Sequence, residues 1–192
     1  MKSIRVFGPA TVANVACAFD ILGCALSAPG DEVIARVKNK SGVSISKITG
    51  DDGRLSKDPK KNTAGVAVLS LLRHLNNNTG IEIALKKNMP LGSGMGSSAA
   101  SAVAAVFAVN KLLDDPLSKE ELLPFAVEAE RIACGSGHAD NAAPSLLGGF
   151  ILIRSYSPLD IVKIPCPKNL FCTVIHPDIE INTRDARRIL RK

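Results

Sequence analysis

Tryptophan is absent from the sequence, tyrosine occurs once, and aromatic residues make up 4% of the 192 residues. Proteins that bind single-stranded nucleic acid stack bases on aromatic side chains. This scarcity argues against a nucleic-acid partner, although the formal net charge is +6. Lysines and arginines are dispersed except at residues 57–61 and 184–192, which indicates solvated surface charge and also suits an anionic small substrate.

Long apolar runs are missing as well. The nearest candidate, residues 99–109, is ended by Lys111, short of the ~18 residues that a membrane-spanning helix needs. The first residues, MKSIRVFGPAT, lack the long apolar segment of a secretory signal. We therefore expect no membrane partner and, by default, a cytoplasmic protein.

The cysteines include no CxxC pair, and their number, five, is odd. Structural zinc sites and disulfide frameworks both rely on paired cysteines. Both are therefore disfavoured, and reduced thiols in a cytosolic protein are expected.

Hydrophobic periodicity predicts a mixture of strands and helices without a regular βα alternation, which is typical of the α+β class. The expected strands are residues 4–7, 32–38, 43–48, 81–86, 150–154 and 170–175. The expected helices follow Asn62, occupy 97–113 and 118–134, and begin again at Thr183. Residues 135–144 are expected to be a polar loop.

Two prolines between Ile164 and Pro167 indicate a domain boundary. We expect one domain over residues 1–165 and the first strand and helix of a second domain over residues 166–192. The ~25 residues after the boundary are too few to fold independently. The sequence is therefore expected to stop just inside its second domain.

The most informative segment is MPLGSGMGSSAASA, residues 89–102, which joins a strand to a nearly all-apolar helix. Glycines at 92, 94 and 96 allow the backbone to approach an anion closely. The following helix start offers unpaired N–H groups and the positive end of its dipole. The segment therefore predicts a phosphate cradle, and a plain tight turn is the alternative.

Two familiar nucleotide motifs do not fit this segment. A Walker loop needs a lysine after its last glycine, but Gly96 is followed by Ser97. A dinucleotide fingerprint has the spacing GxGxxG, and GSGMG differs from it.

The stretch PLGSGMGSSAA, residues 90–100, resembles the ATP signature of the GHMP kinases. Four further segments resemble motifs of the homoserine kinases within that family. They are FGPATVANVACAFDILG from Phe7, KNTAGVA from Lys61, GHADNAAP from Gly137 and TRDARRIL from Thr183. The resemblance covers nearly all of the chain.

This resemblance implies a two-layer α+β amino-terminal domain with a left-handed βαβ crossover, plus the start of a ferredoxin-like second domain. It also implies ATP-dependent phosphorylation of the side-chain hydroxyl of L-homoserine to O-phospho-L-homoserine, in threonine biosynthesis. A full-length homodimer is expected from the same resemblance. The family's third glycine-rich motif and its second substrate arginine are missing, so an incomplete chain with weak or no activity is expected.

The resemblance also assigns site residues. Mg²⁺ is expected at Ser98 and Glu130, which accords with the few protein oxygens that magnesium takes. Catalytic roles fall to Asp140, Asn141 and Glu130, with Asp140 expected to orient the hydroxyl and a base role as the alternative. The nucleotide contacts are expected at Asn62, Thr63, Pro90, Gly92, Ser93, Gly94, Met95, Gly96, Ser97 and Ser98. The homoserine contacts are expected at Asn14, Asp20, His138, Asp140, Thr183 and Arg187.

Simpler interpretations exist for individual residues. Glu130 alone would be a surface charge, Asp140 and Asn141 an Asx turn, and Asn62 a helix cap. For the whole protein, two alternatives stay open: another GHMP kinase of a small alcohol (mevalonate- or sugar-type), and a non-catalytic nucleotide-binding module.

Overall fold

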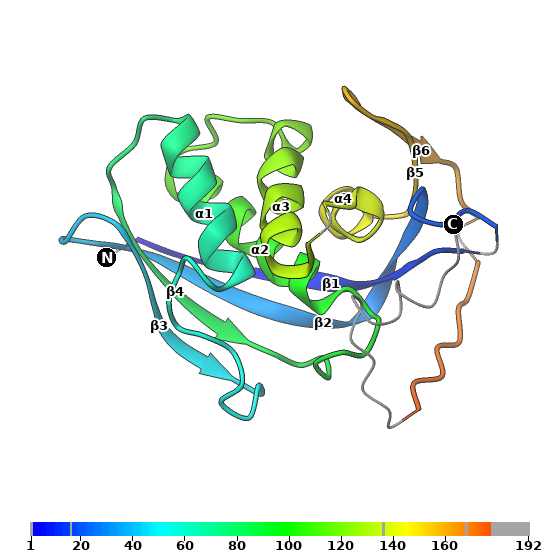
Figure 1. Cartoon of the computed structure of the whole chain (residues 1–192), viewed down its shortest axis with the longest axis horizontal. Helices are drawn as coiled ribbons and strands as arrows, with labels where there is room; N and C mark the ends of the chain where they lie inside the picture. The colour runs from blue at the N-terminus through cyan, green and yellow to red at the C-terminus, as the bar shows by residue number, and fades with distance from the viewer. Residues whose placement is uncertain (1, 16, 136, 168, 178–192) are drawn as a thin grey trace.

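In the part of the chain that the structure describes, a mixed six-stranded sheet carries four helices on one of its faces (Figure 1). The computed structural model describes residues 2–15, 17–135, 137–167 and 169–177. The strands are β1 Ser3–Ala13, β2 Leu22–Lys38, β3 Val43–Thr49, β4 Gly80–Lys86, β5 Phe150–Tyr156 and β6 Leu159–Ile164. The helices are α1 Thr63–His74, α2 Ser97–Leu112, α3 Lys119–Cys134 and α4 Ala139–Leu147.

The strand order is β3-β4-β2-β5-β6, with β1 paired to β2. β3 and β4 pair in parallel and are joined through α1, which makes the βαβ unit of the fold. The β1–β2, β2–β4, β2–β5 and β5–β6 pairs are antiparallel. The observed mixture of strands and helices confirms the predicted α+β class.

β2 is much longer than predicted. The expected strand at 32–38 is present, but β2 begins at Leu22 and has 17 residues. Its first residues pair with β1 and β5, and Pro29 and Gly30 continue the strand. Glycine is favoured at position 30 because a Cβ there would lie 2.6 Å from the backbone carbonyl oxygen of Gly8 on β1. β1 likewise continues past its expected end to Ala13, so pairing between strands outweighs local turn propensity.

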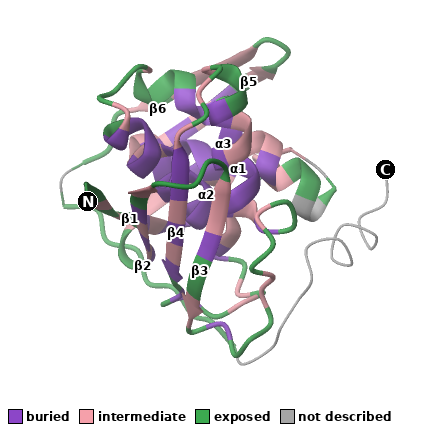
Figure 2. Cartoon of the chain, turned by 90° about the vertical axis from the view of Figure 1, so that its left-hand side faces the viewer, coloured by how far each residue is buried: buried purple, intermediate pink, exposed green. Residues whose placement is uncertain are grey.

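The core lies between the helices and the sheet, where Figure 2 shows the buried residues. α2 is buried on nearly every side, as its apolar composition predicts. β1 approaches this helix closely at Gly8, where a Cβ would lie 2.4 Å from the carbonyl oxygen of Ala100. The strand and the helix that bear the candidate site are therefore held together by backbone contact.

The helices α1 and α3 begin directly after the N-cap residues predicted from the sequence. The side chain of Asn62 accepts a hydrogen bond from the backbone N–H of Ala64 and begins α1. Ser118 and Glu121 form the predicted capping box of α3. Pro124 lies inside α3 without displacing its start. Each of these capping signals involves residues at most three positions apart, and each is present in the folded chain.

Two expectations were wrong, and one strand was missed. Residues 139–147 form α4 rather than a polar loop, although Pro144 lies inside it. Residues 159–164 form β6, which was not predicted, as a hairpin with β5. Residues 170–175 are not a strand, and Phe171 and Ile175 are 91% and 86% exposed. Strand-like composition is not enough without a partner strand. The helix expected from Thr183 lies outside the described residues.

In the part of the chain that the structure describes, no helix has both the length and the apolar character required to cross a bilayer.

Candidate active site

The glycine loop has the backbone conformation that its composition predicts. Gly92, Gly94 and Gly96 all have positive φ, at 70°, 72° and 66°. Gly96 is the N-cap of α2, and no side chain caps this helix by a hydrogen bond. Its first turn contains no acidic residue. The loop therefore presents the start of α2 as a place for an anion.

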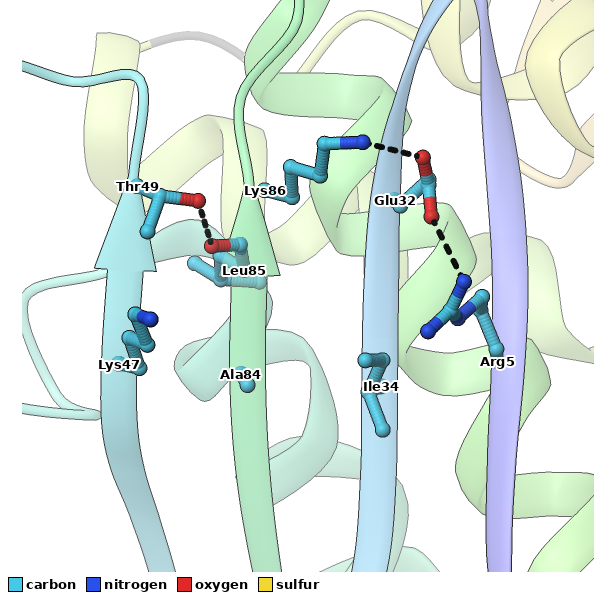
Figure 3. A pocket seen from close by; sticks show the side chains of 8 residues that line it. All are labelled: Arg5, Glu32, Ile34, Lys47, Thr49, Ala84, Leu85 and Lys86. Atoms are coloured by element: carbon cyan, nitrogen blue, oxygen red, sulfur yellow. Dashed lines mark hydrogen bonds and ion pairs between the residues drawn. The ribbon is translucent and has the colours of Figure 1, made fainter.

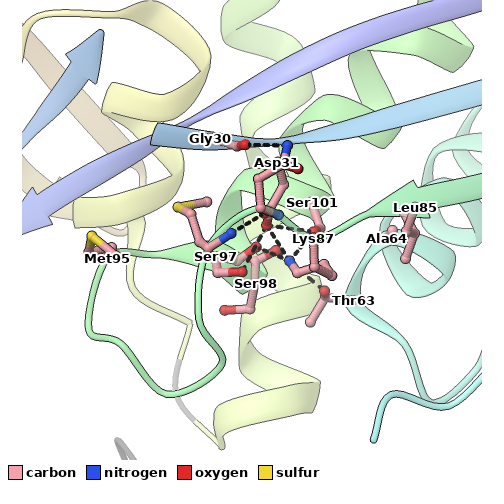
Figure 4. Close-up of polar contacts among 12 residues, drawn as sticks. Gly30, Asp31, Thr63, Ala64, Leu85, Lys87, Met95, Ser97, Ser98 and Ser101 are labelled. Carbon is pink, nitrogen blue, oxygen red and sulfur yellow. Dashed lines mark hydrogen bonds and ion pairs between the residues drawn. The ribbon is translucent and has the colours of Figure 1, made fainter. Parts of the chain in front are cut away.

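A buried ion pair lies against this helix start (Figure 4). Asp31 on β2 pairs with Lys87, the residue after β4, and their side chains are 1% and 2% exposed. Lys87 Nζ also donates to the carbonyl oxygen of Ser97 at 3.0 Å and to Ser101 Oγ at 2.6 Å. The Ser97 hydroxyl donates to Asp31 Oδ2 at 2.8 Å. Two strands and the first turn of α2 thus meet in one polar cluster.

Asp31 also holds the loop that follows β4. Its Oδ1 accepts hydrogen bonds from the backbone N–H groups of Asn88, at 2.8 Å, and Met89, at 3.2 Å. Burial lowers the pKa of Lys87 from its usual value, and the charge of Asp31 opposes that shift. The buried amine and carboxylate therefore depend on each other, because each would be an unpaired charge without its partner.

Ser98 and Glu130 are brought together as expected. The Ser98 hydroxyl, in the first turn of α2, donates to Glu130 Oε2 on α3 at 3.0 Å. The described residues contain no group of three or more His, Cys, Asp or Glu side chains that could hold a metal ion. A hydroxyl and a carboxylate are nonetheless the kind of oxygen donors that Mg²⁺ takes alongside water and phosphate.

The start of α1 adjoins this corner. Thr63 Oγ1 donates to the carbonyl oxygen of Ser98 at 3.3 Å. Asn62 is buried, and its amide also donates to the carbonyl oxygen of Ser56 at 3.0 Å. Helix capping, the simpler interpretation of Asn62, is therefore present. The base- and ribose-side roles of Asn62 and Thr63 stay predictions.

Asn141 connects α4 to the glycine loop. Its Oδ1 accepts from Thr11 Oγ1 at 2.7 Å, and the Thr11 backbone N–H donates to the carbonyl oxygen of Met95 at 3.1 Å. Asp140 is 2% exposed, and its Oδ1 accepts from the backbone N–H of Asn141 at 3.1 Å. α4 is pressed against β2 at Gly23, where a Cβ would lie 1.7 Å from the Asp140 carbonyl oxygen.

The described residues expected to contact homoserine gather beside α4. The backbone N–H of Asp20 donates to Asn14 Oδ1 at 2.7 Å. His138 Nδ1 lies 3.5 Å from Asp20 Oδ2. His138 immediately precedes α4, which carries Asp140. Thr183 and Arg187 lie outside the described residues, so their placement stays a prediction.

Several polar residues of this region were not expected from the sequence: Thr11, Asp31, Lys87, Ser101 and Tyr156. Asp31 and Lys87 are charged residues at the ends of predicted strands, where solvated charge is common. Their pairing spans 56 positions in the sequence. No local pattern therefore marked them as buried.

A second polar region is the hollow on the helix-free face of the sheet (Figure 3). There Glu32 receives a hydrogen bond from Lys86 Nζ at 3.0 Å and lies 3.7 Å from Arg5. The hydrogen bond from Lys86 holds the pKa of Glu32 below its usual value. Both Lys86 and Arg5 thus lie beside the carboxylate of Glu32, which makes this hollow a weaker candidate for an anion site than the glycine loop.

The chain matches the family model described as GHMP kinases N terminal domain over residues 62–149. It is 54% and 56% identical over 200 residues to the homoserine kinases of Chlorobium phaeobacteroides strains BS1 and DSM 266, covering 99% of this chain and 62% of each relative. It is 60% identical to the crystal structure of homoserine kinase from Cytophaga hutchinsonii, with a TM-score of 0.96. That match covers 100% of this chain and 61% of the solved one.

The chain thus spans about 62% of the length of the relatives it matches. The family match and the structural likeness confirm the predicted GHMP amino-terminal fold. By these similarities, the chain contains a GHMP kinase N-terminal domain and is similar to homoserine kinases over about 62% of their length.

Proposed function

We propose that this chain carries the nucleotide-binding part and much of the substrate-binding part of an ATP-dependent homoserine kinase. The observation that carries the proposal is the Ser98–Glu130 hydrogen bond of 3.0 Å at the glycine-capped start of α2. It puts oxygen ligands for Mg²⁺ beside backbone amides suited to phosphate. GHMP kinases use ATP, and the similarity to homoserine kinases supports L-homoserine as the phosphoryl acceptor.

In the proposed reaction, the side-chain oxygen of L-homoserine forms a bond to the γ-phosphorus of ATP. The bond from that phosphorus to the β,γ-bridging oxygen breaks, and ADP and a proton are released. The amides at the start of α2 would orient the phosphates, while the Ser97 hydroxyl holds this helix start by its hydrogen bond to Asp31. A bound Mg²⁺ would supply neutralisation of their charge.

We assign Asp140 the role of orienting the acceptor hydroxyl, with Asn141 as its support. The support for this role is that Asp140 Oδ1 already accepts from the Asn141 N–H, while Asn141 Oδ1 is bonded to Thr11. Phosphoryl transfer through a loose transition state depends mainly on positioning and charge stabilisation rather than on a strong base. Asp20 would face the ammonium of L-homoserine and Arg187 its carboxylate.

A domain boundary near residue 165 is part of the same proposal and is supported by β6, which ends at Ile164. The proposal also includes a cytoplasmic location, where ATP is available, and a full-length protein that is a homodimer.

The proposal is tested by titrating the chain with Mg·ATP and L-homoserine in a calorimeter, and by assaying ADP release from the full-length protein with L-homoserine, mevalonate and galactose. Preference for L-homoserine is expected. Preference for mevalonate or galactose would assign the protein to another GHMP activity. Nucleotide binding without turnover of any acceptor would indicate a binding module.

Glu130→Gln is expected to weaken Mg·ATP binding about tenfold or more, because it removes the one carboxylate proposed to contact the metal. Tenfold corresponds to about 1.4 kcal/mol, within the range of a hydrogen bond or contact to a charged group. Binding of ATP measured in EDTA should change little. Calorimetry at fixed nucleotide and varied Mg²⁺ gives both affinities.

Glu128→Gln is the matched control, since Glu128 lies on the same helix and pairs with Arg131 at the surface. It should leave both affinities within twofold. Equal behaviour of the Glu130 and Glu128 variants would contradict the metal assignment.

A further inference from the structure

Tyr156, the tyrosine at the end of β5, joins two segments that are far apart in the sequence. Its hydroxyl donates to the backbone carbonyl oxygen of Asp20 at 2.5 Å and accepts from the backbone N–H of Ala139 at 3.3 Å. Asp20 belongs to the connection between β1 and β2, and Ala139 is the first residue of α4. A phenol can donate and accept at once, as this bridge requires.

The hydroxyl of Tyr156 provides a hydrogen-bond acceptor for the backbone N–H of Ala139 at the start of α4. The N-cap of α4 is His138, whose side chain makes no capping hydrogen bond. The first N–H groups of a helix have no partner within it. Tyr156 therefore caps α4 from outside, at the residue directly before Asp140.

The ring of Tyr156 also contacts His138. The two rings meet edge to face, with centroids 5.9 Å apart and planes at 87°. His138 Nδ1 in turn lies 3.5 Å from Asp20 Oδ2. One side chain thus touches or adjoins three residues proposed to bind homoserine: Asp20, His138 and Asp140.

The connection between β1 and β2, which Tyr156 contacts at Asp20, contains two residues in an unfavourable backbone conformation. Asn14 and Asp20 have φ values of 58° and 60°, in the left-handed region that side chains other than glycine seldom adopt. Such residues persist where surrounding contacts impose the conformation. The Asp20 N–H to Asn14 Oδ1 bond is one such contact, and the Tyr156 bond to the Asp20 carbonyl is another.

We propose that Tyr156 is a positioning residue that holds the Asn14–Asp20 connection against the start of α4 and so sets affinity for the amino-acid acceptor. The inference rests on the proposed function and deepens it. The nucleotide side of the site is held mainly by Asp31 and Lys87, which pair with each other beside the first turn of α2. The main effect of Tyr156 is therefore expected on the acceptor.

The test is Tyr156→Phe, which removes the hydroxyl and retains the ring. In the full-length protein, KM for L-homoserine should rise about tenfold, the effect expected when a bridge of two hydrogen bonds is lost. KM for ATP and the Mg·ATP affinity should stay within twofold. Amide hydrogen exchange at Ala139 should accelerate, because its N–H loses its partner. Loss of a residue that only stabilised the fold would change the KM values for both substrates together.

Ser155→Ala is the matched control. It removes a hydroxyl from the same strand, where Ser155 Oγ accepts from the Ser157 N–H in the β5–β6 turn. It should leave both KM values unchanged. Thermal unfolding of each variant verifies that it is folded at the assay temperature.

The outcomes separate the two claims. If wild type binds L-homoserine and Tyr156→Phe binds it equally well, the positioning role is overturned and the proposed function stands. If wild type binds Mg·ATP but no L-homoserine, the proposed function falls and so does the acceptor role of Tyr156. Unchanged exchange at Ala139 in Tyr156→Phe would overturn the bridge itself in either case.

Discussion

Lys87→Met is expected to lower the free energy of unfolding by about 3–5 kcal/mol, the usual cost of removing one partner from a buried ion pair. Asp31 is 1% exposed, and without Lys87 its carboxylate would lie buried beneath the glycine loop without a counter-charge. Methionine has a similar length and adds no polar group, so packing is largely retained. Urea unfolding followed by circular dichroism measures the change.

The double variant Asp31→Asn with Lys87→Met is the informative comparison. It removes both charges and should recover much of the stability lost in Lys87→Met, because no unpaired buried charge remains. The cycle formed by the two single variants and the double variant isolates the coupling between the residues. Additive losses would show that the two side chains contribute to stability independently, which a coupled buried ion pair does not allow.

The same ion pair should influence ligand binding. Lys87 Nζ contacts the Ser97 carbonyl oxygen, and Asp31 accepts from the Ser97 hydroxyl. Under conditions where the Asp31→Asn, Lys87→Met protein is folded, its Mg·ATP affinity should still be reduced, since Ser97 has lost both anchors. Restored stability without restored affinity would separate support of the fold from positioning of the loop.

Gly96→Ala is expected to weaken Mg·ATP binding about a hundredfold. A Cβ at this position would lie 2.3 Å from Thr11 Oγ1 and 2.7 Å from Asn141 Oδ1. It would also place a side chain at φ 66°, which costs about 1–2 kcal/mol. The variant must therefore shift the loop, break the Thr11–Asn141 hydrogen bond, or do both. Calorimetric titration with Mg·ATP and with Mg·ADP measures the loss.

Gly94→Ala is the control that separates backbone strain at positive φ from the steric conflict of the new Cβ with its neighbours. Gly94 has nearly the same φ, 72°, but a Cβ there would meet nothing within 4 Å. The two variants share the conformational strain, and only Gly96→Ala adds the steric conflict. Gly94→Ala should lose about tenfold in affinity, the equivalent of ~1.4 kcal/mol. Equal losses would mean that the contact between the glycine loop, β1 and α4 has no role in nucleotide binding.

The elements predicted correctly share one physical property, since their signals are local. The Asn62 cap, the Ser118–Glu121 capping box and the apolar α2 each depend on residues within a few turns of one another. The glycine loop belongs to this group, because glycine composition sets its accessible φ values. The juxtaposition of Ser98 and Glu130 was also expected, but from the family resemblance rather than from the residues alone.

The elements missed depend on contacts between distant segments. No strand was predicted over residues 22–31, yet β2 begins at Leu22 and its pairing with β1 and β5 carries it through Pro29 and Gly30. α4 looked like a loop, because Gly135 and Pro144 bracket a polar stretch, and it is held as a helix against β2 and by the hydroxyl of Tyr156. Packing energy from such contacts exceeds the small local preferences that sequence patterns report.

Sequence alone specified the α+β class, the buried helix and the conformation of the glycine-rich loop, because backbone freedom and hydrophobic periodicity are set by consecutive residues. It did not specify that Asp31 and Lys87 pair beneath that loop, or that Tyr156 ties Asp20 to α4. Those arrangements bring together residues 56 and 136 positions apart. Their stability arises from burial and from hydrogen bonds that exist once the sheet and helices have closed around them.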